Sequence, residues 1–254
     1  MPEDETGTSG FATLETSTAP VAAAASPSPK TGVSETPKWE TVTRKRLSDY
    51  VKGHLANLAK LKKEDANEAT VRLIITDLLN RGFGYDLVSE LAPEFMVRGE
   101  FADYGIRVGT DLKAFLEVKR PSTKLTVNHL KQVQSYAVNE GVEWLWLTNG
   151  ATWQVWHLTG GLPVKLDLVF ELDLLDETPY SKKMEFLFLL TQESMKRNQI
   201  ATVWAQRAAV SPENVRAALL SEDVVASARK QLRKTTGYNA SVEEITNGII
   251  ALIN

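Results

Sequence analysis

Apolar residues recur every three or four positions in two stretches, the first of which begins near Trp39. In that stretch the spacings are 3, 1, 4 and 3, which predicts one apolar helical stripe made of Leu47, Tyr50, Val51, Leu55 and Leu58. In the second stretch Asp65 is the predicted N-cap, Glu68 follows three positions later, and the pattern ends at Arg81-Gly82 after Val71, Ile74, Ile75, Leu78 and Leu79. The pattern therefore predicts two consecutive amphipathic helices.

Beyond Gly82 the apolar pattern changes to alternation in segments rich in Val, Leu, Phe and Trp. These segments are predicted strands, at residues 86–91, 103–108, 112–119, 143–148, 151–158 and 164–173. Asn149-Gly150 lies between two of them and indicates a hairpin. A helix over Val127 to Asn139, capped by Thr126 and ended by Gly141, is predicted between the third and fourth strands. This order predicts an α/β (α+β) fold with a mixed sheet flanked by helices.

From Ser181 onward the pattern is helical. Ser211-Pro212-Glu213 supplies an N-cap and a proline in the first turn, and Ser221 and Ser241 are further predicted caps. We therefore expect an α/β domain over residues 39–178 and a small all-α module over residues 179–254. An apolar stripe in that module either packs within it or docks onto a protein partner: Leu219, Leu220, Val224, Val225 and Ala228. The pattern leaves the oligomeric state open.

The first 38 residues differ in composition from the rest. They contain 12 Ser or Thr, 6 Ala and 5 of the 10 Pro, which predicts a disordered tail. The chain has 29 Lys or Arg against 32 Asp or Glu, and the whole net charge of −3 falls in the tail, so residues 39–254 are neutral. That balance lacks the basic excess of proteins that coat nucleic acid. Four basic residues beside the first helical stripe form a solvated face or contact DNA: Arg44, Lys45, Arg46 and Lys52.

Composition excludes several classes of chemistry. The chain has no cysteine, which removes disulfides, thiolate zinc sites and cysteine nucleophiles and favours a cytoplasmic protein. No apolar run approaches the roughly 20 residues of a membrane span, and the run from Val21 to Ala25 is too short for a signal peptide. The phosphate-binding loop G-x-x-x-x-G-K-[ST] does not occur. We expect neither membrane association nor an ATP site.

Candidate chemistry gathers on the third predicted strand. Its even positions are apolar and are expected to face the core: Leu112, Ala114, Leu116 and Val118. Glu117 and Lys119 then share the other face, about 7 Å apart, and Asp103 on the preceding strand can lie beside Glu117 because neighbouring strands are about 4.8 Å apart. Two carboxylates and a lysine suit Mg²⁺, for which Mn²⁺ can substitute, and phosphodiester hydrolysis. The alternative is a surface salt bridge between Glu117 and Lys119.

Four short motifs follow one another in a set order. They are Asp103-Tyr104-Gly105-Ile106, Glu117-Val118-Lys119-Arg120-Pro121, Gln132 with Tyr136, and Leu147-Thr148-Asn149-Gly150 with Trp153. Together they resemble the PD-(D/E)XK nuclease superfamily and, within it, the N-terminal nuclease domain of the restriction (R) subunit of type I restriction enzymes. The resemblance covers about residues 40–175. It implies a restriction-endonuclease-like fold and a Mg²⁺-dependent DNA nuclease, an endonuclease of bacterial or phage origin.

The resemblance also implies roles for single residues. Asp103 and Glu117 correspond to the metal ligands, and Lys119 to the lysine that positions or activates the attacking water. Glu68 corresponds to the acidic residue of the first core helix, and it shares a helical stripe with Val71, Ile75 and Leu79. The alternative role of Glu68 is a capping box with Asp65.

Gln132 and Tyr136 match the Q-x-x-x-Y motif of type I nucleases. Four residues apart on a helix, they share one face with His129 and either hydrogen-bond a DNA phosphate, orient the lysine, or form a polar solvent stripe. Three basic residues after the lysine are predicted to contact DNA as a local basic rim: Arg120, Lys124 and Lys131. Four tryptophans on the hairpin strands are assigned to packing rather than base stacking: Trp144, Trp146, Trp153 and Trp156.

Two departures from the family pattern bear on function. Ala102 stands where the motif has proline, a change that leaves the metal-binding aspartate in place. Type I R subunits also join this nuclease to an ATP-driven translocase, whereas we expect here a nuclease domain that works without its own motor. The alternative is a catalytically silent nuclease-fold module that binds DNA or protein within a larger defence or phage assembly. Paired carboxylates argue against that alternative, because without metal they repel DNA.

Overall fold

The computed structural model describes residues 36–97, 100–161 and 163–253. The predicted disordered tail, except for its last three residues, lies outside these described residues. The chain divides into two units, Met1–Ile200 and Ala201–Asn254. Within the described ranges, no helix has both the length and the apolar character needed to cross a bilayer.

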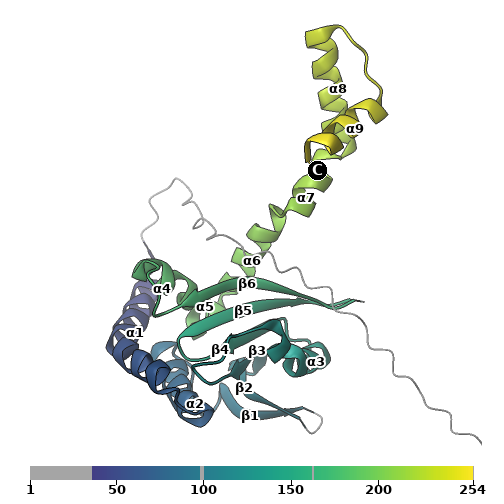
Figure 1. Cartoon of the computed structure of the whole chain (residues 1–254). Coiled ribbons are helices and arrows are strands. Elements are labelled where there is room, and N and C mark those ends of the chain that lie inside the picture. The colour runs from purple at the N-terminus through teal and green to yellow at the C-terminus, as the bar shows by residue number, and fades with distance from the viewer. Residues whose placement is uncertain (1–35, 98–99, 162, 254) are drawn as a thin grey trace, which may run out of the picture. The chain divides into compact units, whose positions relative to one another are not determined.

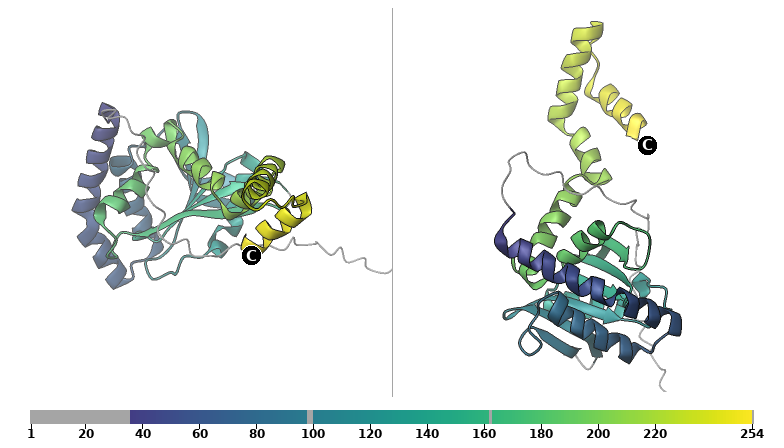
Figure 2. Two further views of the ribbon diagram at one scale, coloured as in Figure 1. Left: turned by 90° about the horizontal axis from the view of Figure 1, so that it is seen from above. Right: turned by 90° about the vertical axis from the view of Figure 1, so that its left-hand side faces the viewer.

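The two predicted N-terminal helices are confirmed. Helix α1 (Lys38–Glu64) buries Leu47, Val51 and Leu58, and helix α2 (Glu68–Asp77) buries Val71 and Ile75 before it passes into a π-helical turn, η1 (Leu78–Gly82). The two helices lie side by side against the sheet (right panel of Figure 2). Their apolar stripes therefore face the core, as the periodicity predicts.

The predicted cap of α2 at Asp65 is wrong. Asp65 is instead the left-handed C-cap of α1, with φ 45° and ψ 56°, a conformation that Asp tolerates better than most residues. Its N–H donates to the carbonyl of Leu61, and Asn67 caps α2 by accepting the N–H of Thr70 at 2.9 Å. Glu68 therefore makes no capping box with Asp65.

A six-stranded sheet forms the centre of the first unit (Figure 1). Its strands lie in chain order: β1 (Leu91–Val97), β2 (Glu100–Val108), β3 (Asp111–Val118), β4 (Trp144–Thr148), β5 (Thr152–Thr159) and β6 (Lys165–Asp173). Only β3 and β4 are parallel, so the sheet is mixed. The strand predicted at 86–91 is wrong, because the Asp86 carboxylate accepts the N–H groups of Val88 and Ser89 and closes a turn there.

Both faces of the sheet are covered. The parallel pair is joined through a 3₁₀ turn, η2 (Val127–Leu130), and helix α3 (Lys131–Glu140), which lies on the side of the sheet opposite α1 and α2 (Figure 1). The caps of this segment are confirmed, since Thr126 and His129 form a capping box and Gly141 is left-handed. Beneath α3, Phe115 packs edge-on to Tyr136. The odd positions of β3 therefore also contribute to the core.

The hairpin tryptophans pack in the core, as predicted. Trp146 and Trp153 are fully buried, and their rings tilt against those of Tyr85 and Phe83. Asn149 and Gly150 connect β4 to β5, with Gly150 at φ 95°, a backbone conformation that favours glycine. The hairpin thereby fixes where β4 ends, next to the end of β3.

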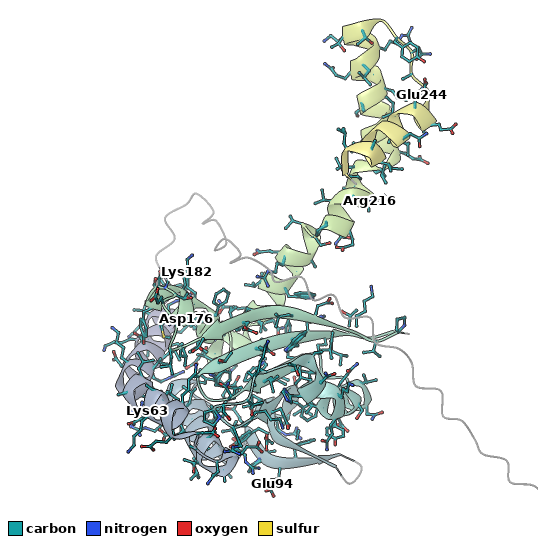
Figure 3. The ribbon with its side chains drawn as sticks, viewed as in Figure 1. Lys63, Glu94, Asp176, Lys182, Arg216 and Glu244 are labelled. Atoms are coloured by element: carbon teal, nitrogen blue, oxygen red, sulfur yellow. The ribbon has the colours of Figure 1, made fainter. Side chains whose placement is uncertain are left out.

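The predicted domain boundary at residue 178 is too early. Helices α4 (Tyr180–Phe188) and α5 (Gln192–Lys196) belong to the first unit, which ends at Ile200. Lys183 is buried and donates to the carbonyls of Leu174 and Asp176, in the loop before α4 (Asp176 is labelled in Figure 3). The N–H of Gln192 donates to the carbonyl of Phe83. These contacts, to the loop that follows β6 and to Phe83 directly after η1, hold α4 and α5 on the α/β fold.

The second unit is helical, as expected. Helix α6 (Gln199–Ala209) leads into it, and α7 (Pro212–Leu219), α8 (Glu222–Thr236) and α9 (Val242–Ile253) follow. Ser211 caps α7, and Ser241 and Glu244 (Figure 3) cap α9 reciprocally. Val225 of the predicted apolar stripe is buried in a small core with Ala240 and Ile245, whereas Val224 is exposed. The stripe is thus only partly used for packing within the unit.

Candidate active site

The sheet topology brings several candidate residues to one edge. Because β3 and β4 are parallel and Val118 pairs with Thr148, the carboxyl ends of both strands meet there. Strand β2 runs antiparallel to β3, and its pairing of Tyr104 with Leu116 brings Asp103 to the same edge. The alternation along β3 and its pairing with β2 therefore bring Asp103, Glu117 and Lys119 together, as expected from the sequence.

Asp103 is held by two donors from different elements. Its Oδ2 accepts the backbone N–H of Val118 at 2.7 Å, and its Oδ1 accepts Nη1 of Arg72 at 3.0 Å. Asp103 thus binds the main chain of β3 directly, in line with its position beside Glu117. The carboxylate is fixed next to the residue that separates Glu117 from Lys119.

Glu117 and Lys119 form an ion pair, with 2.5 Å between Lys119 Nζ and Glu117 Oε1. Burial, followed by the negative charge of Asp103, raises the pKa of Glu117 in spite of this lysine. Burial lowers the pKa of Lys119, but the hydrogen bond and charge of Glu117, with Glu68 and Asp103, outweigh burial and leave that pKa raised. Lys119 is therefore protonated near neutral pH in the metal-free protein.

Glu68 is near enough to contribute to this cluster. It begins α2, its side chain is partly exposed, and its charge raises the pKa of both Glu117 and Lys119. Counted with Glu68, the site has three carboxylates and two cations, Lys119 and Arg72. The site holds an excess of negative charge that its own cations do not neutralise.

The donor set of this edge fits a hard divalent cation. Among the described residues, no three His, Asp or Glu side chains gather as a ready metal cage. Asp103 and Glu117 are two carboxylates in mutual repulsion, and Mg²⁺ is commonly held by one or two carboxylates while it keeps several waters. Asp103 and Glu117 would hold the ion.

The segment after Lys119 is tied down by hydrogen bonds. The N–H of Lys119 donates to the carbonyl of Thr148 at 2.7 Å, and Asn149 Nδ2 donates to the carbonyl of Thr123 at 3.1 Å. Asp65 accepts from Arg120 and from the N–H of Ser122. Asn149 Nδ2 also donates to the carbonyl of Pro121 at 3.4 Å, so Asn149 connects the fourth sequence motif with the second, a contact that alternation alone does not reveal.

Gln132 and Tyr136 do not share one environment. Gln132 is exposed on α3, whereas Tyr136 is buried in the core cluster beneath the helix, with its ring centroid 6.5 Å from that of Phe115. Burial of Tyr136 is incompatible with direct contact between its side chain and a DNA phosphate. His129, the third residue of the predicted face, takes part in the capping box with Thr126.

The basic residues predicted to contact DNA are only partly available for that contact. Lys124 and Lys131 are exposed, but Arg120 donates to Asp65 at 2.7 Å. Three basic residues of α1 are engaged with carboxylates, Arg44 with Glu40, Lys45 with Asp49 and Arg46 with Glu193. This pairing favours the solvated, packing role of α1 over contact with DNA.

The sequence prediction missed Arg72. It lies one turn after Glu68 on α2, and this spacing of four residues puts the two side chains on one helical face. That spacing is the signal in the sequence that indicates a shared face with Glu68. The ion-pair partner of Arg72, Asp103, is 31 residues away along the chain and is brought close only by the fold.

Comparisons of this chain with models of protein families, with curated proteins and with solved structures gave no match. The site geometry and the chain's own motifs therefore carry the function proposed below.

Proposed function

We propose that the protein is a Mg²⁺-dependent DNA endonuclease that hydrolyses phosphodiester bonds. The observation that carries the proposal is the meeting of Asp103, Glu117 and Lys119 at one sheet edge, with an ion pair of 2.5 Å between the last two. The motif resemblance to type I restriction R subunits supports the same chemistry. The proposal assigns the reaction to the cytoplasm of a bacterial or phage-infected cell.

In this proposal each side chain has a limited task. Asp103 and Glu117 would hold the metal ion, which would lower the pKa of a bound water and offset negative charge in the transition state. Lys119 carries a positive charge and stabilises the negative charge that develops on the phosphate. The hydrogen bonds of Val118, Thr148 and Asn149 fix the backbone that presents these groups. Exposed Lys124 and Lys131 attract the DNA backbone.

A cleavage assay tests this function. Linear, circular and single-stranded DNA are incubated with Mg²⁺ or Mn²⁺ and with wild type, Asp103→Ala or Lys119→Ala. We expect wild-type cleavage and a loss of about a hundredfold or more in both variants. Lys113→Ala is the matched control, since Lys113 lies on the same strand and pairs with Asp111.

Cleavage that survives in both Asp103→Ala and Lys119→Ala contradicts the proposal. Wild-type protein that binds DNA but cuts none of the three substrates with either metal supports the silent binding module instead.

A further inference from the structure

Each proposed metal ligand is already paired with a cation of the chain itself. Glu117 meets Lys119, the lysine of the sequence motif, and Asp103 meets Arg72, which belongs to none of the motifs. Arg72 Nη1 lies 3.0 Å from Asp103 Oδ1. A divalent cation that binds Asp103 meets this guanidinium first.

Arg72 is anchored by its backbone, and its side chain is partly exposed. Its carbonyl accepts the hydroxyl groups of Thr76 at 2.9 Å and of Tyr104 at 3.0 Å, so this turn of α2 is tied to β2. The side chain of Arg72 is 34% exposed, against 10% for Asp103. The guanidinium can therefore leave Asp103 without movement of the helix.

Asp103 keeps its orientation when Arg72 leaves. Its other oxygen, Oδ2, accepts the N–H of Val118 at 2.7 Å, a bond to the rigid strand β3. Loss of the arginine therefore frees Oδ1 while the carboxylate stays beside Glu117. A carboxylate fixed by one oxygen and free at the other is suited to receive a cation.

We propose that Arg72 is a displaceable counter-ion of the metal site, which neutralises Asp103 in the metal-free protein and contacts a DNA phosphate once a divalent cation has taken its place. This inference rests on the proposed function. Two cations on one carboxylate repel each other, so Arg72 lowers the affinity of the site for metal. The freed guanidinium lies on the same helical face as Glu68, at the edge of the site, and its planar donors match phosphate oxygens.

Substitution of Arg72 by methionine separates this role from a structural one. We expect Arg72→Met to bind Mn²⁺ about fivefold more tightly than wild type in calorimetric titration, the effect of removing one part-exposed competing charge. At saturating Mn²⁺ we expect single-turnover cleavage to fall about tenfold, because one charged contact to phosphate is lost. Arg72→Lys is expected to restore part of both properties.

Arg81→Met is the matched control. Arg81 lies in η1, and its side chain is mostly exposed, with a loose contact of 3.6 Å to Asp77. Arg81→Met is expected to change neither Mn²⁺ affinity nor cleavage. Opposite changes in the two properties mark the counter-ion role, because general loosening of the site weakens metal binding and cleavage together.

The failures of the two proposals are distinguishable. Wild-type protein that binds no Mn²⁺ and cuts no DNA overturns the nuclease function and this inference with it. Wild-type protein that binds Mn²⁺ and cuts DNA, alongside a folded Arg72→Met variant with equal or weaker Mn²⁺ affinity, overturns only the role of Arg72.

Discussion

Glu117 and Glu193 are both partly buried, and each accepts a hydrogen bond from a cationic side chain, but their pKa values move in opposite directions. Burial raises the pKa of Glu117, the charge of Asp103 raises it further, and Lys119 does not compensate. Burial also acts to raise the pKa of Glu193, but the hydrogen bonds and charge of Arg46 outweigh it and leave that pKa lowered. The two glutamates differ in what surrounds the ion pair.

Around Glu193 the fold supplies hydrogen-bond donors that match the negative charge of the carboxylate. Arg46 binds both carboxylate oxygens, at 2.7 and 2.8 Å, and also donates to the carbonyls of Gly82 and Phe83. Around Glu117 the fold gathers further carboxylates. The first arrangement stabilises the joint between α1, η1 and α5, and the second leaves negative charge that a bound cation can neutralise. An ion pair alone therefore does not distinguish a structural site from a chemical one.

Removal of Arg46 is predicted to have the largest effect on stability. Arg46→Ala leaves Glu193 without its fork of donors and removes one donor each from the carbonyls of Gly82 and Phe83. We expect unfolding free energy to fall by about 2–3 kcal/mol in urea denaturation, less than for a fully buried pair because both side chains are part-exposed. Lys45→Ala, which breaks an exposed pair with Asp49, is the control, with an expected loss of about 0.3–0.5 kcal/mol. Equal losses of unfolding free energy in Arg46→Ala and Lys45→Ala contradict the assignment of the pair between Arg46 and Glu193 as a structural one.

Neutralisation of the two glutamates is predicted to have smaller effects of opposite sign. A raised pKa means that the fold loses stability as pH rises from the ordinary glutamate pKa, about 4.3, through the folded value. Glu117→Gln is therefore expected to raise the Tm of metal-free protein near neutral pH by a few degrees.

A lowered pKa means that Glu193 stabilises the fold above its unfolded pKa and loses this effect as pH falls through the folded value. Glu193→Gln is expected to lower Tm near neutral pH by a similar amount.

Thermal melts across a pH series, with a chelator present, check both signs. Both differences from wild type are expected to shrink as the pH approaches the acid range in which each glutamate is protonated. A Glu117→Gln variant that is less stable than wild type at every pH refutes the account of charge repulsion at the site.

The sequence predicts the site residues on strands better than those that depend on tertiary contacts. Alternation along β3 and the spacing to β2 are local properties, and they suffice to bring Asp103, Glu117 and Lys119 together. Arg72 was missed because helical spacing shows its face but not its partner. The boundary at residue 178 failed because a switch to helical periodicity does not show that Lys183 and Gln192 bond back to the first unit.

Environment also separates residues that a motif treats as equivalent. Gln132 and Tyr136 are four apart on α3, yet Tyr136 is in the core and Gln132 is exposed, because the helix lies flat on the sheet with one side inward. Periodicity assigns both to one face, but α3 buries Val133, Tyr136 and Ala137, so Tyr136 belongs to its core-facing side and Gln132 does not. Resemblance by motif therefore identifies positions, and packing decides what each position can touch.

A crystal of the protein soaked with Mn²⁺ tests the central claim most directly, because the anomalous signal of the metal reports its position. The account predicts a peak between the carboxylates of Asp103 and Glu117, at coordination distance from both, with Arg72 no longer on Asp103. A crystal that takes up Mn²⁺ elsewhere, or none at Asp103 and Glu117 at saturating concentration, contradicts the assignment of this edge as a metal site.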